Sequence, residues 1–183
     1  MPVAHIHSFL GYSQDKNLHM RKPLSLSFIM ISLFVFSGCL KDGSQSYTCT
    51  ANIPQVSVPA NEVAAVEAYL AQKGITDAQK SNFGFYYKID VAGTGITPTV
   101  CSNVTLYYQG KLIDGTTFDQ TGASPVTFQL GQLITGWQLG LPLIKTGGKI
   151  KLYLPPTLAY GSRAVGSIPA NSILIFEITL VAA

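Results

Sequence analysis

Aromatic side chains and glycine-rich turns dominate the part of the chain between Tyr107 and Phe176. This segment reads YYQGKLIDGTTFD, then FQLGQLITGW, then LAYGSRAVGSIPANSILIFEI, and it offers few side chains that could act as acids, bases or nucleophiles. The carboxylate of Asp119 stands out among them. An aromatic cup that carries one carboxylate binds an apolar group and changes its surroundings, which is catalysis only for reactions that need no covalent intermediate.

The N-terminus has the layout of a secretory signal. Arg21 and Lys22 precede an apolar run from Leu24 to Phe36, which is shorter than the about 20 residues that a membrane-spanning helix needs. The residues FSGC, which end at Cys39, resemble a bacterial lipobox, in which the cysteine is lipidated and begins the mature chain. A plain signal peptide with an incidental cysteine and an uncleaved anchor are the two alternatives.

We therefore expect residues 1–38 to be removed, and residues 1–19 to be an upstream extension, because Met20 directly precedes the basic pair. The lipid on Cys39 would then hold the protein on a membrane of the bacterial cell envelope. The outer membrane and a periplasmic face both fit this interpretation, and exposure at the cell surface is a further option.

Removal of residues 1–38 would also remove every histidine of the chain: His5, His7 and His19. This excludes histidine-based triads, histidine general bases and histidine-ligated zinc. Lys and Arg fall from 12 to 9, and Asp and Glu from 9 to 8, so the mature chain is close to neutral and nothing indicates a nucleic-acid partner. We expect no cofactor and no metal.

Two further cysteines, Cys49 and Cys101, remain once Cys39 carries the lipid. In an exported protein an even pair indicates a disulfide, with two free buried thiols as the alternative. The two lie far apart in the sequence and have no histidine beside them, which makes them a poor metal site.

One helix is expected before the main domain. Residues 39–60 are polar, with Pro and Ser, and are typical of a tether. Residues 61–82 follow as a helix and its connector, with Asn61 as the N-cap, Gly74 at the end, and apolar residues at helical spacing: Val63, Val66 and Leu70. We interpret the helix as a packing or spacer element, and a dimerising helix is the weaker alternative.

Residues 83–183 are predicted to form the folded domain, because alternating and aromatic-rich segments begin at Phe83 with FGFYYKIDV. Asp114-Gly115 is a hairpin turn signal, and one short helix is expected around Leu139 to Ile144. This pattern predicts an α+β fold in which an antiparallel sheet curls around one short helix. The further strands are expected at Asn103 to Leu112, Val126 to Leu130, Lys149 to Leu154 and Ser172 to Val181.

Several spaced motifs, taken in order, resemble the FKBP-type peptidyl-prolyl cis-trans isomerases. The motifs are YYxGKLxDGTxFD, LGQLIxGW, LxxxKxGGK, LxPxLAYG and SIPxNSxLIFEI, and the resemblance runs from about Phe83 to the C-terminus. The fold of that family is a five- or six-stranded antiparallel sheet wrapped around a short helix, which agrees with the strand pattern.

The resemblance implies an apolar pocket for a substrate proline. Trp137 would form its floor, and Val126 stands where the family often has another phenylalanine, which makes the rim thinner. The walls and the apolar side would come from five residues: Tyr108, Phe118, Phe176, Leu133 and Ile134.

The resemblance also implies three polar roles. The hydroxyl of Tyr160 would bond a substrate carbonyl, and the backbone N–H of Ile168 would hold the carbonyl beside the proline. Asp119 would pair with Tyr108 and face the reacting amide. The rim segments QTGAS and SRAVGS are shorter than in typical members of the family, whose ligands include macrolide inhibitors.

Together these features predict a peptidyl-prolyl isomerase that acts on proline-containing polypeptides and assists the folding of exported proteins. Rotation about an X–Pro bond must cross a barrier of about 18–20 kcal/mol, because the amide loses its resonance. A dry aromatic pocket favours the less polar, twisted amide over the planar, hydrated one, without an acid or a base. The alternative is a non-catalytic FKBP-fold chaperone or protein-binding module in the cell envelope.

Overall fold

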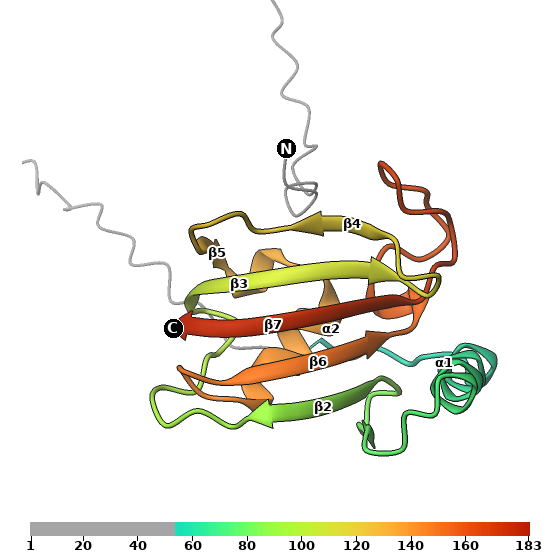
Figure 1. Ribbon diagram of the computed structural model, residues 1–183, viewed down its shortest axis with the longest axis horizontal. Coiled ribbons are helices and arrows are strands. Elements are labelled where there is room, and N and C mark those ends of the chain that lie inside the picture. The colour runs from blue at the N-terminus through green and yellow to red at the C-terminus, as the bar shows by residue number, and fades with distance from the viewer. Residues whose placement is uncertain (1–53) are drawn as a thin grey trace, which may run out of the picture. The chain divides into compact units, whose positions relative to one another are not determined.

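The computed structural model describes residues 54–183, so the predicted signal, the lipidated Cys39 and most of the tether lie outside the described residues. The described part is one antiparallel sheet with short helices, which confirms the predicted α+β fold (Figure 1). Its elements are α1 (Ala60–Gln72), β1 (Gln79–Lys80), β2 (Tyr86–Val91), β3 (Asn103–Leu112), β4 (Thr117–Gln120), β5 (Val126–Gln129), η1 (Leu130–Gln132), α2 (Thr135–Gly140), η2 (Leu141–Leu143), β6 (Lys149–Leu154), η3 (Pro156–Leu158) and β7 (Leu174–Ala182).

The strand order in the sheet is β1-β2-β6-β7-β3-β4, and β5 pairs with β3 off this path. Burial alternates along β3, because successive side chains of a strand point to opposite faces. Val104, Leu106 and Tyr108 therefore lie on the inner face, where they join the main hydrophobic core. Figure 1 shows α2 behind the central strands, so this helix covers the face that carries the core.

Two glycines let α2 lie directly on β6. A Cβ atom added to Gly136 would come within 2.4 Å of the side chain of Leu154, and one added to Gly140 would come within 2.8 Å of Leu152. Any larger residue at these positions would push the helix away from the sheet. The short helix predicted around Leu139 to Ile144 is therefore misplaced toward the C-terminus, because Pro142 lies in the following η2 turn and not inside α2.

The helix α1 packs on the other face of the sheet. Its buried residues Val66 and Leu70 contact Tyr153 of β6 and Ile175 of β7, in a cluster separate from the main core. The predicted end of the helix is confirmed, since Gly74 has a φ of +65°.

The predicted N-cap of α1 is wrong. The helix begins at Ala60, and no side chain caps it; Asn61 already lies inside the helix. The carbonyl of Pro59 accepts the N–H groups of Glu62 and Val63 at 3.0 and 3.2 Å. A proline just before a helix has its φ already close to the helical value, which explains this start.

Strand boundaries differ from the prediction where turns intervene. The first long strand begins at Tyr86 and not at Phe83, because the Ser81 hydroxyl accepts the N–H groups of Phe83 and Phe85 and holds them in a turn. The turn at Asp114-Gly115 is confirmed, with φ +93° at Gly115, and the short strand β4 that follows it was not among the predicted strands.

Cys101 is disulfide-bonded, and its partner lies outside the described residues. The pairing with Cys49 therefore stays a prediction. Val56 and Val58, which belong to the predicted tether, pack against the main core. Within residues 54–183, no helix is long and apolar enough to cross a membrane.

Candidate active site

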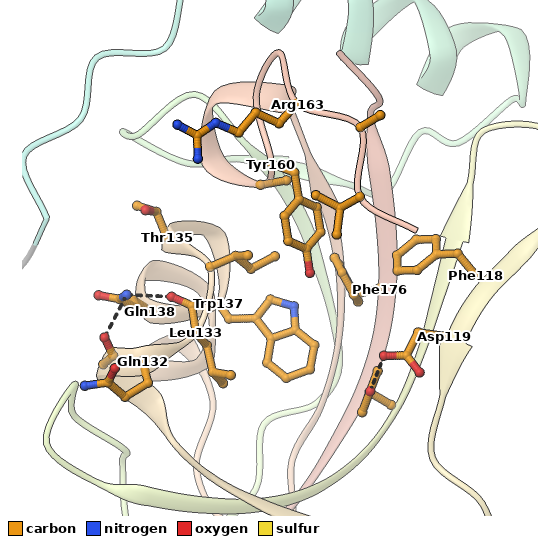
Figure 2. Close-up of a pocket in the computed structure, with 16 residues that line it drawn as sticks. Phe118, Asp119, Gln132, Leu133, Thr135, Trp137, Gln138, Tyr160, Arg163 and Phe176 are labelled. Carbon is orange, nitrogen blue, oxygen red and sulfur yellow. Dashed lines mark hydrogen bonds between the residues drawn. The ribbon is translucent and has the colours of Figure 1, made fainter. Parts of the chain in front are cut away.

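A cavity of about 650 Å³ lies between α2, the strands β3, β4 and β7, and the chain that follows η3 (Figure 2). Eight of the ten residues predicted to act on or bind substrate line it, and Val126 and Ile168 do not. The eight are Tyr108, Phe118, Asp119, Leu133, Ile134, Trp137, Tyr160 and Phe176.

Trp137 forms the floor of the cavity and is only 3% exposed. Its indole meets the rings of Tyr108 and Phe176 edge to face, with both pairs of ring centroids 5.2 Å apart. Phe118 continues the wall against Phe176, at 5.6 Å and 87°. Rings from α2, β3, β4 and β7 thus fix one another in the edge-to-face geometry that aromatic pairs prefer.

The indole N–H of Trp137 is buried and has no hydrogen-bond partner among the described residues. A buried donor without a partner costs free energy. Trp137 therefore does more than fill the hydrophobic core. In Figure 2 the nitrogen edge of the indole faces the side of the cavity that carries Tyr160.

Gly110 of β3 makes room for the aromatic wall. It pairs with Asp119 on β4 and with Phe176 on β7. A Cβ atom at this position would come within 2.5 Å of the Phe118 ring and 2.9 Å of the Phe176 ring. The two rings can therefore fold over the strand only because residue 110 has no side chain.

The hydroxyl of Tyr108 donates a hydrogen bond of 2.5 Å to Oδ2 of Asp119. Burial raises the pKa of Tyr108, and this hydrogen bond raises it further. Burial, and then the negative charge of Asp119, also raise the pKa of Tyr160. Both phenols therefore keep their protons and remain hydrogen-bond donors at neutral pH.

The predicted role of Ile168 is wrong. Its side chain is 1% exposed, and its N–H already donates to the carbonyl of Val165 at 2.9 Å. The two residues close a tight turn across Gly166, whose φ is +56°. The amide at Ile168 is therefore committed to the turn and does not reach the cavity.

Val126 also lies away from the cavity. It is half-buried at the start of β5 and pairs with Leu106 of β3. The strand β5 pairs with one end of β3, and Gly110 lies near the other end. Val126 therefore packs against the core and does not reach the rim of the cavity.

A backbone donor that the sequence did not indicate lies at the start of α2. Ile134 lines the cavity, and within the described part of the chain its N–H donates to no backbone carbonyl. The first N–H groups of a helix have no partner inside the helix, which explains this free donor. The side chain of Gln138 holds the loop in place by donating to the carbonyls of Leu133, at 2.7 Å, and Gly131, at 3.3 Å.

The cavity also has a polar rim that the sequence did not indicate. Gln132, Thr135 and Gln138 line it on the α2 side, and Arg163 follows η3 in the SRAVGS loop. Figure 2 shows Arg163 and Asp119 at opposite ends of the cavity. The cavity therefore has an apolar floor with one cation and one carboxylate at its two ends.

The sequence matches a known protein family. The model of the FKBP-type peptidyl-prolyl cis-trans isomerase family matches residues 95–181. The isomerase FkpA of Escherichia coli K12 is 43% identical over 116 residues, which cover 62% of this chain and 42% of that protein. FkpA of Buchnera aphidicola from Schizaphis graminum is 45% identical over 118 residues, covering 63% of this chain and 46% of the relative. The chain thus matches less than half the length of these relatives.

Solved structures of peptidyl-prolyl cis-trans isomerases are similar to this chain in fold. The crystal structure of E. coli FkpA has a TM-score of 0.60 at 40% identity and covers 67% of this chain and 59% of its own. A peptidyl-prolyl cis-trans isomerase from Pseudomonas syringae pv. tomato has a TM-score of 0.59 at 31% identity, over 70% of this chain and 98% of its own. With the family's motifs, its sheet and an aromatic cavity in place, the chain belongs to the FKBP-type peptidyl-prolyl cis-trans isomerases.

Proposed function

We propose that this chain is an active peptidyl-prolyl cis-trans isomerase that acts on proline-containing polypeptides. The observation that carries the proposal is the cavity floored by Trp137, walled by aromatic rings and flanked by two donors that have no hydrogen-bond partner among residues 54–183. These donors are the hydroxyl of Tyr160 and the N–H of Ile134. They stand where a chain bound across the floor presents its carbonyl groups.

The proline ring would lie on the indole of Trp137, between the rings of Phe118 and Phe176. Tyr160 and Ile134 would then hold backbone carbonyls on the proline side of the X–Pro bond, so that this side is fixed while the carbonyl of the reacting amide turns. Water is excluded from the reacting amide, which disfavours the planar and more polar ground state. Each 1.36 kcal/mol removed from the barrier of about 18–20 kcal/mol accelerates the rotation about tenfold.

Asp119 would contribute through its charge. Tyr108 holds this carboxylate at the edge of the cavity by the hydrogen bond of 2.5 Å. The oxygen of a planar amide carries more negative charge than that of a twisted amide, because resonance is lost on twisting. A carboxylate facing that oxygen therefore destabilises the ground state more than the transition state, and this difference lowers the barrier.

The activity is tested with a proline-containing peptide whose cis-trans isomerisation is followed optically. We expect the purified protein to accelerate it. Trp137→Ala should mainly raise KM, because the floor of the pocket is lost, and Asp119→Ala should mainly lower kcat. Val126→Ala, which alters a residue away from the cavity, serves as the control and should keep kcat/KM close to the unaltered value.

If the folded protein does not accelerate the isomerisation, the proposed enzymatic activity is refuted. The result would favour the alternative, a non-catalytic protein-binding module. In that case proline-containing peptides would still bind, and binding would still weaken in Trp137→Ala.

We further propose that the protein is held on a bacterial envelope membrane by a lipid on Cys39 and assists the folding of exported proteins. Support comes from the basic pair, the apolar run and the residues FSGC, which end at the proposed first residue of the mature chain. Incorporation of labelled fatty acid into the protein, and its absence in Cys39→Ala, would establish the anchor. Cell fractionation with surface proteolysis would then identify the membrane and its face.

Macrolide inhibitors are further proposed ligands of the same cavity, since its floor and aromatic walls are apolar. Inhibition of the peptide assay by a macrolide tests this, and a macrolide that leaves the rate unchanged contradicts it.

A further inference from the structure

A carboxylate of α1 reaches across the molecule to the turn that precedes the cavity. Glu62 accepts two hydrogen bonds from Thr157, one from its backbone N–H to Oε2 at 2.9 Å and one from its hydroxyl to Oε1 at 2.8 Å. Both bonds are partly buried, and they join residues 95 positions apart. Hydrogen bonds to an ionised carboxylate are about twice as strong as neutral ones.

The sequence of the turn explains why Thr157 needs this partner. Pro155 and Pro156 precede it, and neither has a backbone N–H. Thr157 therefore supplies the first backbone donor of η3, which has no acceptor within the turn itself. The carboxylate of Glu62 satisfies this donor and binds the adjacent hydroxyl as well.

Tyr160 follows directly from this turn. The carbonyl of Pro156 accepts the N–H of Ala159 and that of Gly161, each at 2.9 Å, so that Tyr160 lies inside a closed loop. Ala159 and Tyr160 both line the cavity. The position of the Tyr160 ring is therefore set by the same turn that Glu62 holds at Thr157.

The helix itself is firmly placed. Val66 and Leu70 of α1 pack on Tyr153, two residues before Pro155, and on Ile175 of the neighbouring strand. The strand end and the turn are thus attached to one helix, the first by apolar contact and the second by the carboxylate of Glu62.

We propose that Glu62 is a positioning residue for the isomerase reaction: it fixes the turn at residues 155–161 so that the hydroxyl of Tyr160 meets the substrate carbonyl. This inference rests on the proposed function of the cavity. It makes α1 a part of the active-site scaffold and not only a spacer.

The first experiment compares two carboxylates of the same helix. Glu67 also connects α1 to the sheet, since it accepts hydrogen bonds from Lys80 at 2.8 Å and Tyr86 at 2.5 Å, but it does not touch the turn. Glu62→Ala should lower kcat/KM about tenfold, the order expected when a catalytic group is displaced by a fraction of an ångström. Glu62→Gln keeps one acceptor oxygen, so its kcat/KM should lie between that of Glu62→Ala and that of the unaltered protein. Glu67→Ala should stay within about twofold of the unaltered protein.

A double variant shows whether Glu62 acts through Tyr160. In a Tyr160→Phe background the hydroxyl is already absent, so Glu62→Ala should cause almost no further loss. Additive losses would overturn the proposal, as would equal losses in Glu62→Ala and Glu67→Ala, which would indicate general destabilisation.

Hydrogen exchange at the Gly161 amide gives a readout that needs no activity. It should speed up in Glu62→Ala and stay unchanged in Glu67→Ala. Unchanged exchange in Glu62→Ala overturns the inference even if the isomerase is active. An inactive protein with faster exchange instead refutes the proposed function and leaves the coupling between Glu62 and the turn in place.

Discussion

Tyr108 and Tyr160 place two hydroxyl groups in one cavity, but with different partners. Tyr108 donates to Asp119, whereas the hydroxyl of Tyr160 has no hydrogen-bond partner among residues 54–183. Burial raises the pKa of both groups, so both act as donors and neither acts as a base. The same side-chain type therefore orients a carboxylate at one place and leaves a hydroxyl available in the cavity at the other.

With Tyr160 as a hydrogen-bond donor, we expect kcat/KM to change little with pH. The chain has no histidine after residue 19, and the pKa of Tyr160 is raised above the ordinary tyrosine value of about 10. We expect kcat/KM to be constant between about pH 6 and pH 9, and to fall only at higher pH, where Tyr160 loses the proton that it donates. Tyr160→Phe should lower kcat/KM about tenfold and abolish that alkaline fall, because one hydrogen bond to substrate is missing.

The measurement is a pH series of the peptide assay, with the fold checked at each pH by circular dichroism. A steep change near pH 6.5 would contradict the assignment, since residues 54–183 contain no histidine that could titrate there.

At the scale of elements, the cavity depends on close approach between backbone and rings. Gly110 lets Phe118 and Phe176 fold over β3, and Gly136 lets α2 lie on β6. The helix then presents Trp137 to the rings and leaves the N–H of Ile134 free at its start. The cavity therefore requires a glycine at both positions, although glycine inside a strand or helix is usually destabilising.

Gly110→Ala tests this directly. The added methyl group would collide with both rings, and overpacking of this kind costs about 1–3 kcal/mol. We expect a lower midpoint of urea unfolding and, in the protein that remains folded, a reduced kcat/KM, because the aromatic wall is displaced. Gly122→Ala is the matched control, since nothing lies within 4 Å of a Cβ atom there and its backbone needs no positive φ. Equal effects of the two substitutions would show that the wall tolerates the methyl group.

At the scale of the whole molecule, the sequence predicts what repeats locally and misses what depends on distant contacts. The alternation of apolar residues places β3 at Asn103–Leu112 and β6 at Lys149–Leu154, and both ranges agree with the structure. The helix α2 was misplaced because two of its residues are glycines, which local propensity assigns to turns and which only packing on β6 explains.

In the cavity, too, the sequence predicts local features and misses those that depend on distant contacts. Sequence motifs indicate side chains such as Trp137, whereas the availability of a backbone N–H depends on the turn that surrounds it. Ile168 loses its N–H to a turn at Gly166, and Ile134 keeps one free at the start of a helix. The contact between Glu62 and Thr157 has no local signal at all, because the two residues meet only in the folded chain.

Buried tyrosines connect the stability of the whole domain to alkaline pH. Burial raises the pKa of Tyr153 to about 12, and it raises the pKa values of Tyr108 and Tyr160 as well. In the unfolded chain a tyrosine loses its proton near pH 10, so the folded state binds more protons above that pH. The resulting stability is fully present below about pH 10 and is lost as the pH rises through the folded pKa values.

We therefore expect the free energy of unfolding, measured in urea by circular dichroism, to stay level between about pH 6 and pH 9 and to fall between about pH 10 and pH 12. Tyr153→Phe keeps the packed ring against Val66 and Leu70 but removes its ionisable group, so it should make the alkaline fall shallower. The expected difference is about 1.4 kcal/mol for each unit by which the two pKa values of Tyr153 differ. An equally steep fall in Tyr153→Phe would place the alkaline sensitivity in other groups, with Tyr108 and Tyr160 at the cavity as the next to be replaced.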